Sequence, residues 1–359
     1  MTEISDRKRE HLALATDPDA QSTVSPGWDD IHLVASSIPT VDLDAVDVSV
    51  ELSGHRLEAP YVIASMTGGH EDALALNESL AVAAQELGVA IGSGSQRAAL
   101  RHPELAKTYT VIRDTAPDAV VMANIGISQL VDQGDTPALT RDEIETAIGM
   151  LSAQFLVIHL NAVEEAIQPE GDASSKGLLA ALGEVVAMSS IPVVAKETGG
   201  GMSAESARSL VTAGVAVLDV GGAGGTSFAR IEGRRAAMRG DHKRERLGVT
   251  FGGWGIPTAA SILEVRGAGV PSIATGGVRN GLHAAKAIAI GAAAVGIGGP
   301  MLKAAMEGPD AAVAELSMFV DELKLATQLT GCSDMEGLRA HEPVLTGAMR
   351  EWAVQRRLL

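Results

Sequence analysis

The stretch FLVIHLNAVEEAIQPEGD, residues 155–172, joins an apolar run to a dense polar segment. Because Phe155–Ile158 is apolar without alternation, it predicts a strand that is buried on both faces. A hard divalent cation that shares oxygen ligands with a phosphorylated substrate would explain the polar residues that follow. The alternative is a solvated acidic loop, but the start of the cluster at a predicted barrel strand end favours function. The polar residues are His159, Asn161, Glu164, Glu165, Gln168, Glu170 and Asp172.

Seven further apolar runs of the same kind recur along the chain, with helical patterns between them. Glycines stand just past three of these patterns, as is usual for helix C-termini: Gly88 after 73–87, Gly214 after 203–213 and Gly291 after 282–290. This repetition predicts an α/β fold, a (β/α)₈ TIM barrel with an N-terminal extension, and leaves an open doubly wound sheet as the alternative. The predicted strands are Tyr61–Met66, Val89–Gly92, Ala119–Ala123, Phe155–His159, Ile191–Lys196, Val215–Val220, Val270–Thr275 and Ala293–Gly298.

Two regions lie outside this repetition. Residues 1–60 form a predicted N-terminal arm and hairpin, in which alternating Val46–Leu52 and a turn at Gly54 would close the bottom of the barrel. Residues 61–359 form the barrel, so that the chain is one domain overall. The long connection 221–268 is rich in Arg and Lys. We interpret it as a mobile lid or a subunit contact, with a merely solvated loop as the alternative for its middle portion.

The bulk composition excludes several classes of partner. The 359 residues are 46% hydrophobic but only 3% aromatic, which predicts a large aliphatic core. A net charge of −17 argues against nucleic acid and against an anionic membrane surface. Cys332 is the single cysteine, so an intrachain disulfide is excluded and a reducing compartment is expected. The charged N-terminus does not have the pattern of a signal peptide, and we predict a soluble cytoplasmic protein.

Glycine pairs follow the last two predicted strands. Gly276-Gly277 comes after the seventh and Gly298-Gly299 after the eighth, with Arg279 close by. In TIM barrels the loops at these two places often bind phosphate through backbone N–H groups and a short helix N-terminus. Glycine permits a close approach of the backbone, and Arg279 would add a charged fork. The pattern predicts a phosphate site.

Polar side chains at the other strand ends would complete a ring around that phosphate site. A ring of amides, hydroxyls and one lysine suits a planar heterocycle with a phosphate tail, and we infer flavin mononucleotide (FMN). Lys196 would stabilise negative charge on the reduced flavin, and because a buried ammonium is costly alone, it must have a partner. The ring consists of Thr67, Ser93, Ser95, Gln96, Arg97, Asn124, Lys196, Glu197, Asp219 and Thr226.

Motifs in this order and spacing resemble the type II, flavin-dependent isopentenyl diphosphate isomerases over about 350 residues. The matching segments are RKREH, ASMTGG, GSGSQR, MANIG, HLNAVEEAIQPEGD, VVAKETGGGMS, DVGGAGGTSFARIE, WGIPTAAS, TGGVRNGLHAAKAIAIGA and LTGAMREW. The resemblance implies interconversion of isopentenyl and dimethylallyl diphosphate by proton addition and removal, with reduced flavin as acid and base. It also implies NADPH or another donor as flavin reductant, Mg²⁺, and a homo-oligomer, a tetramer or octamer.

The resemblance also implies roles for individual residues. FMN would be held by Met66, Thr67, Ser95, Asn124, Lys196, Thr226, Gly277, Arg279, Gly298 and Gly299. The prenyl diphosphate substrate would contact Arg7, Lys8, Arg97, His159, Asn161 and Gln168. Glu165 would bind Mg²⁺, and the candidate catalytic residues are Glu164, His159 and Lys196. Arg7 and Lys8 would arrive on the N-terminal arm and close over the diphosphate.

One position departs from the family pattern, which usually has Gln-Glu where this chain has Glu164-Glu165. A carboxylate near a diphosphate is unfavourable unless a cation or a proton offsets it. Glu164 is therefore a second metal ligand, a protonated acid, or a sign of a different or longer prenyl substrate. Two further alternatives are a flavin oxidoreductase of the hydroxy-acid oxidase kind and a flavin-binding protein without catalysis. The first is disfavoured because that class needs a catalytic base and an arginine that grips a carboxylate, whereas the equivalent region here carries metal-type ligands. The intact set His159, Asn161, Glu165 and Lys196 disfavours the second.

Overall fold

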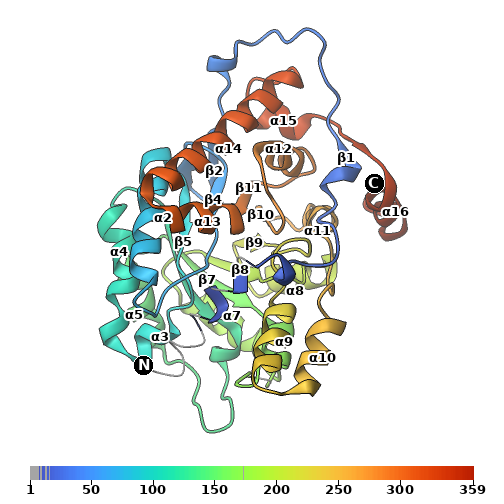
Figure 1. The fold of residues 1–359 in the computed structure, drawn as a ribbon. Helices are drawn as coiled ribbons and strands as arrows, with labels where there is room; N and C mark the ends of the chain where they lie inside the picture. Colours follow the sequence, from blue (N-terminus) through green and yellow to red (C-terminus); the bar gives the residue numbers. More distant parts are fainter. Residues whose placement is uncertain (1–7, 9, 13, 16, 173) are drawn as a thin grey trace.

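The structure of the protein is a computed structural model that describes residues 8, 10–12, 14–15, 17–172 and 174–359. Its centre is a closed barrel of eight parallel strands in the order β10-β11-β4-β5-β6-β7-β8-β9 (Figure 1). The predicted (β/α)₈ barrel is confirmed, and the closed ring excludes the open sheet. The barrel strands are β4 (Tyr61–Ile63), β5 (Ala90–Gly92), β6 (Val121–Gly126), β7 (Phe155–Leu160), β8 (Val193–Glu197), β9 (Val217–Asp219), β10 (Ser272–Thr275) and β11 (Ala294–Ile297).

Helices surround the barrel, as Figure 1 shows. Glycines in the left-handed region follow the helices where the sequence predicts them; Gly88, for example, caps the first of them at φ 60°. The α-helices are α2 (Ala73–Leu87), α3 (Arg97–Arg101), α4 (Lys107–Thr115), α5 (Arg141–Leu151), α6 (Ala162–Ile167), α7 (Leu178–Met188), α8 (Ala204–Thr212), α9 (Phe228–Met238), α10 (His242–Thr250), α11 (Thr258–Val265), α12 (Gly281–Ala289), α13 (Gly299–Glu307), α14 (Pro309–Leu329), α15 (Met335–Ala340) and α16 (Gly347–Arg356). Short 3₁₀ helices are η1 (Pro18–Ala20), η2 (Trp28–Asp30), η3 (Leu43–Ala45), η4 (Pro103–Leu105) and η5 (Ile127–Leu130).

Two small antiparallel sheets lie outside the barrel. Strands β2 (Val50–Leu52) and β3 (His55–Leu57) form a hairpin whose turn residues Ser53 and Gly54 both have positive φ. The ring of His55 contacts that of Phe155 at a centroid distance of 5.1 Å, and Phe155 is the first residue of β7. The hairpin therefore lies at the N-terminal end of that barrel strand. Strands β1 (Ile31–His32) and β12 (Val344–Leu345) pair on the outside.

The connection 221–268 contains three helices, so the alternative of a solvated loop for its middle portion is wrong. All eight residues of α11 are buried. Helices α9 and α10 cross closely at Gly233 and Gly248, where a Cβ on Gly248 would lie 2.4 Å from the Cα of Gly233. The charged residues that suggest a loop are in part buried and paired, as Arg235 and Glu232 are. Whether the segment moves as a lid or contacts a second subunit stays a prediction.

A search of the described residues for membrane-spanning segments finds no helix with the length and apolarity that crossing a bilayer requires.

Candidate functional site

A cavity of about 290 Å³ opens at the carboxyl ends of the barrel strands. The residues to which the family resemblance assigns a role all line it where the structure describes them, and Arg7 lies outside the described residues. Four other members of the predicted ring are not among the lining residues: Ser93, Gln96, Glu197 and Asp219. Parallel strands bring their carboxyl ends to one face of a barrel, which is why positions so distant in the sequence meet here. The lining includes Lys8, Met66, Thr67, Ser95, Arg97, Asn124, His159, Asn161, Glu164, Glu165, Gln168, Lys196, Thr226, Gly277, Arg279, Gly298 and Gly299.

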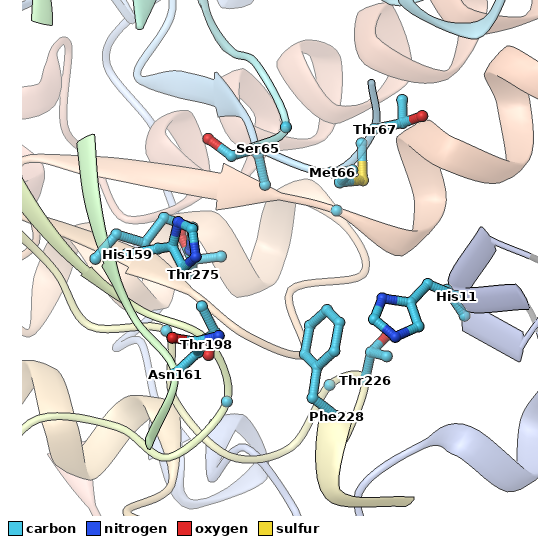
Figure 2. Close-up of a pocket in the computed structure, with 18 of the residues that line it drawn as sticks. His11, Ser65, Met66, Thr67, His159, Asn161, Thr198, Thr226, Phe228 and Thr275 are labelled. Carbon is cyan, nitrogen blue, oxygen red and sulfur yellow. The ribbon is translucent and has the colours of Figure 1, made fainter. Parts of the chain in front are cut away.

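The cavity wall also includes His11 and Phe228, to which the family resemblance assigns no role. Figure 2 shows His159, Asn161 and Thr198 on one side and His11 with Phe228 on the other. The rings of His11 and Phe228 meet edge to face at a centroid distance of 6.0 Å. His11 comes from the N-terminal arm, which we define as the residues before Pro18 that the structure describes, and Phe228 begins α9. The arm and α9 together form the side of the cavity that faces the strand ends.

Backbone surrounds the glycine-rich end of the cavity. Gly277 has φ 64°, and a Cβ there would lie 2.5 Å from the carbonyl oxygen of Gly224. Glycine is therefore required for the chain to turn at that position. Gly299 differs: it begins α13, lines the cavity, and a Cβ there would meet no atom within 4 Å. The N–H groups at this helix start have no partner within the helix and point toward its N-terminal side.

Lys196 has the partner that its burial requires. Its Nζ lies 3.2 Å from Oδ2 of Asp219, and the two side chains are only 8% and 5% exposed. Strand register places them there, because Lys196 of β8 stands opposite Asp219 of β9. Nζ also donates to the carbonyl oxygen of Glu197. The ammonium group is thus held at the cavity wall by a buried carboxylate.

The hydrogen bonds of Asn124 fix the orientation of His159. Nδ2 of Asn124 donates to the carbonyl oxygen of Ser93 at 3.0 Å, so its Oδ1 is the atom that faces the imidazole. Nδ1–H of His159 then donates to this oxygen at 2.8 Å. The remaining ring nitrogen, Nε2, can accept a proton and then donate to an anion.

The charged side chains of Lys8 and Arg97, which are predicted to bind the diphosphate, contact protein oxygens. Nζ of Lys8 donates to the carbonyl oxygens of Gly68 and Ser95 at 2.6 and 2.9 Å, and to the hydroxyl of Tyr109 at 2.6 Å. Nη1 of Arg97 lies 2.6 Å from Oδ2 of Asp172. Lys8 thereby joins the N-terminal arm to the loops that follow β4 and β5.

Two neutral donors contact Glu165, the predicted Mg²⁺ ligand. Nδ2 of Asn161 donates to Oε1 at 2.9 Å, and the backbone N–H of Asp172 donates to Oε2 at 2.7 Å. The same Nδ2 donates to Oε2 of Glu164 at 3.2 Å. Asn161 therefore orients both carboxylates of the Glu164-Glu165 pair.

Glu164 lies within reach of two groups from other elements, His11 of the arm and Glu232 of α9. Burial, reinforced by the charges of Glu232 and Glu165, raises the pKa of Glu164 to about 7 from its usual value of 4.5. The opposing influences are His11 and the hydrogen bond from Asn161, which lower the pKa. Near neutral pH the carboxyl group can therefore hold a proton.

A buried ion-pair network connects the arm, α9 and the loop after α6. The fully buried guanidinium of Arg235 contacts Glu232 at 2.6 Å, Glu10 at 2.8 Å and Glu170 at 3.3 Å. Arg239 also contacts Glu10 and Glu170. The RKREH and SFARIE motifs contain Glu10, His11 and Glu232, but sequence alone does not reveal that they meet.

We expect Glu164→Gln to remove a pH dependence of stability. The folded state holds a proton on Glu164 that the unfolded chain releases, so the free energy of unfolding falls as pH rises from 4.5 to about 7. Partial exposure limits the effect to roughly 1–2 kcal/mol. Urea denaturation of the flavin- and metal-free protein at pH 5 and pH 8 would measure it, with Glu78→Gln on the exposed side of α2 as control. Equal losses in wild type and Glu164→Gln would contradict the assignment.

Comparison with known proteins gives two consistent findings. Residues 15–343 match the FMN-dependent dehydrogenase family. The chain is 43% identical to the isopentenyl-diphosphate delta-isomerase of Halobacterium salinarum, over 99% of this chain and 97% of that protein. It is 44% identical to the enzyme of the same name from Methanosarcina mazei, over 98% of this chain and 95% of that protein.

Solved structures of more distant proteins share the fold. A mandelate oxidase structure with a bound hydroxy acid has a TM-score of 0.62 at 19% identity, covering 96% of this chain and 99% of that one. A lactate oxidase from Pediococcus acidilactici has a TM-score of 0.65 at 14% identity, covering 97% and 95%. At these identities the likeness concerns the barrel architecture alone.

Proposed function

Because this chain belongs to the isopentenyl-diphosphate delta-isomerases, within the FMN-dependent dehydrogenase family, we propose that it interconverts isopentenyl and dimethylallyl diphosphate for isoprenoid biosynthesis. The observation that carries this proposal is the cavity itself. It is lined by every described residue that the family resemblance assigns to flavin, diphosphate or metal. Full-length identity above 40% to proteins of this name supports the same reaction.

The donor set of the cavity fits FMN. The open space at Gly299 and the helix start behind it would receive the phosphate, with Gly277, Gly298 and Arg279 beside it. Arg279 is already oriented, since its Nη2 donates to Oε1 of Gln21 at 3.3 Å. Oγ1 of Thr275 is buried at the cavity wall and has no hydrogen-bond partner among the described residues, so it can bond to a ligand. Met66, Thr67, Ser95, Asn124, Lys196 and Thr226 would surround the ring.

The chain's own residues then position the substrate. When bound and reduced by NADPH, FMN supplies an electron-rich ring and an exchangeable proton. Lys8, Arg97, His159, Asn161 and Gln168, with Arg7, would hold the diphosphate, and Glu165 would bind Mg²⁺. His159 can donate through Nε2 once protonated, because Nδ1 is committed to Asn124. Phe228 and Leu12 line the cavity beside the arm and would keep water from a cationic transition state.

The chain's charge and its relatives suggest the setting of this activity. We propose that the protein works as a homo-oligomer, a tetramer or octamer, in the cytoplasm. Neither nucleic acid nor an anionic membrane is a suitable partner for a chain with a net charge of −17. Light scattering of the purified protein tests the oligomer.

An isotope experiment tests the reaction. The protein is reconstituted with FMN, reduced without oxygen by dithionite, and given isopentenyl diphosphate and Mg²⁺ in heavy water. We expect dimethylallyl diphosphate that carries deuterium, because the proton is added from an exchangeable source. Oxidised flavin should give no product. Deuterium-free product, or full activity of the oxidised form, would contradict the proposal.

Glu164 supports a second candidate, the same type of isomerase acting on a different or longer prenyl diphosphate. Its carboxyl group stands where the family usually has an amide, and it lines the cavity. Absence of turnover with isopentenyl diphosphate, together with turnover of geranyl-type substrates, would favour this candidate.

We also expect Glu164→Gln to keep or raise isomerase activity at saturating Mg²⁺, because the amide removes a negative charge near the diphosphate. Initial rates with reduced FMN measure this, and the exposed variant Glu78→Gln serves as the control. A loss of a hundredfold or more, the scale of general acid–base contributions, would show that the carboxyl group takes part in the reaction.

A further inference from the structure

We propose that His11, Glu164 and Glu232 form a second divalent-cation site, of the Mn²⁺ type, that fastens the N-terminal arm to α6 and α9. One ligand atom from each residue lies within 4.8 Å of the other two. The three residues come from the arm, α6 and α9, so one ion would connect three separate segments. This site is distinct from Glu165 and does not depend on the reaction proposed above.

The spacing of the ligand atoms is close to what a cation needs. Nε2 of His11 and Oε1 of Glu232 are 2.5 Å apart, and the largest separation in the group is no more than 4.8 Å. Ligand atoms about 2.1 Å from a metal lie roughly 3–4 Å from one another. Side-chain shifts on the order of 0.5 Å would therefore bring these three ligand atoms to the spacing around a bound cation. The side chains need no new rotamers on that scale.

A buried oxygen next to the group points to a missing partner. Asn161 is only 5% exposed, and its Nδ2 donates to Glu164. Its Oδ1 is buried and has no hydrogen-bond partner among the described residues. Buried polar atoms are almost always satisfied, so this amide oxygen is open to a ligand or to ligand-bound water, which the diphosphate proposed above or a cation held by Glu164 would each supply.

The charge balance of the surrounding network also calls for a cation. Four carboxylates meet around the group, those of Glu10, Glu164, Glu170 and Glu232, against the two guanidinium groups of Arg235 and Arg239. When Glu164 is ionised, the four carboxylates exceed the two guanidinium groups by two negative charges, although Glu232 itself already contacts Arg235 and His11. One divalent cation neutralises the remainder.

The ligand types select the class of metal. An imidazole nitrogen with two carboxylates suits Mn²⁺, Fe²⁺, Co²⁺ or Zn²⁺, whereas Mg²⁺ prefers oxygen ligands and retains its water. The family pattern has glutamine in place of Glu164, and the neutral amide is a weaker ligand than a carboxylate. We therefore attribute this site to the substitution that distinguishes the chain.

Mn²⁺ binding to the full-length protein tests the proposal. The Glu165 site shares its cation with the substrate diphosphate and should stay weak without it. Titration without substrate, followed by the loss of free Mn²⁺ signal in electron paramagnetic resonance, should therefore give one site with a dissociation constant in the micromolar range. His11→Gln and Glu164→Gln should each weaken it at least tenfold. Both leave the buried pair Arg235–Glu232 intact, so the fold is expected to persist. Mg²⁺ should compete only at a hundredfold higher concentration or more.

Two matched variants separate this site from other sources of binding. Glu165→Gln should change the Mn²⁺ affinity less than twofold, because Glu165 is outside the group. His242→Gln removes an exposed His–Glu pair at 3.1 Å and should have no effect. Mn²⁺ should also slow tryptic cleavage after Lys8 in wild type and not in Glu164→Gln. Affinity unchanged by Glu164→Gln, or lost only in Glu165→Gln, would overturn the proposal whether or not the protein isomerises its substrate.

Discussion

Replacing Gly299 with valine is expected to abolish FMN retention while the fold stays intact. The residue begins α13, lines the cavity and has no atom within 4 Å of the position that a Cβ would take. A Cβ at this position therefore meets no atom outside its own helix and its chain neighbours. The valine side chain would occupy the space in front of the helix start that a phosphate needs. We expect FMN affinity to fall at least a hundredfold, about 2.7 kcal/mol, and the free energy of unfolding to change by less than about 1 kcal/mol.

Flavin fluorescence titration and urea denaturation of the flavin-free protein measure the two quantities separately. Gly149→Val is the matched control, since Gly149 is also a helical glycine whose Cβ would meet no atom within 4 Å, but it lies in α5 and does not line the cavity. It should bind FMN like wild type. FMN affinity of Gly299→Val within threefold of wild type would mean that the phosphate lies elsewhere.

Lys196→Met should both destabilise the protein and weaken FMN binding. The substitution leaves Asp219 as a buried carboxylate without its ion-pair partner, which costs about 3–5 kcal/mol. It also removes the positive charge that we assign to the reduced flavin ring, for which we expect a loss of affinity of ten- to a hundredfold. Thermal unfolding and flavin titration are the measurements.

A second variant separates the two effects. In Lys196→Met/Asp219→Asn the buried negative charge is gone as well, and the amide can still accept from the backbone N–H of Gly221, as Oδ1 of Asp219 does. We expect most of the stability to return while FMN affinity stays low. Recovery of FMN binding together with stability would show that Lys196 has only a structural role.

Much of this fold was predictable because its signals are local. Uninterrupted apolar runs such as Phe155–Ile158 indicate strands that are buried on both faces. Glycines such as Gly88 end helices because they readily adopt a left-handed backbone conformation. The cavity lining was predictable for a related reason. Once the strands are known to be parallel, residues at their carboxyl ends must share one face, so Asn124, His159 and Lys196 meet whatever the helices do.

Pairings between distant segments were not predictable in the same way. The sequence requires a partner for Lys196 but does not identify Asp219, which depends on strand register. The helices in 221–268 were missed because arginines that look solvated, such as Arg235, are buried against carboxylates from other segments. His11 and Glu232 are more than two hundred positions apart, and no periodicity in either segment encodes their contact.

The strand pair β1–β12 has a consequence for how the molecule is assembled. Ile31 pairs with Leu345, so the β1–β12 sheet joins segments more than three hundred residues apart in the chain. The barrel also closes over a wide separation, since Tyr61 of β4 pairs with Val295 of β11. Segments from both ends of the chain are thus needed to complete sheets, and a chain cut before Val344 would leave β1 without its partner strand.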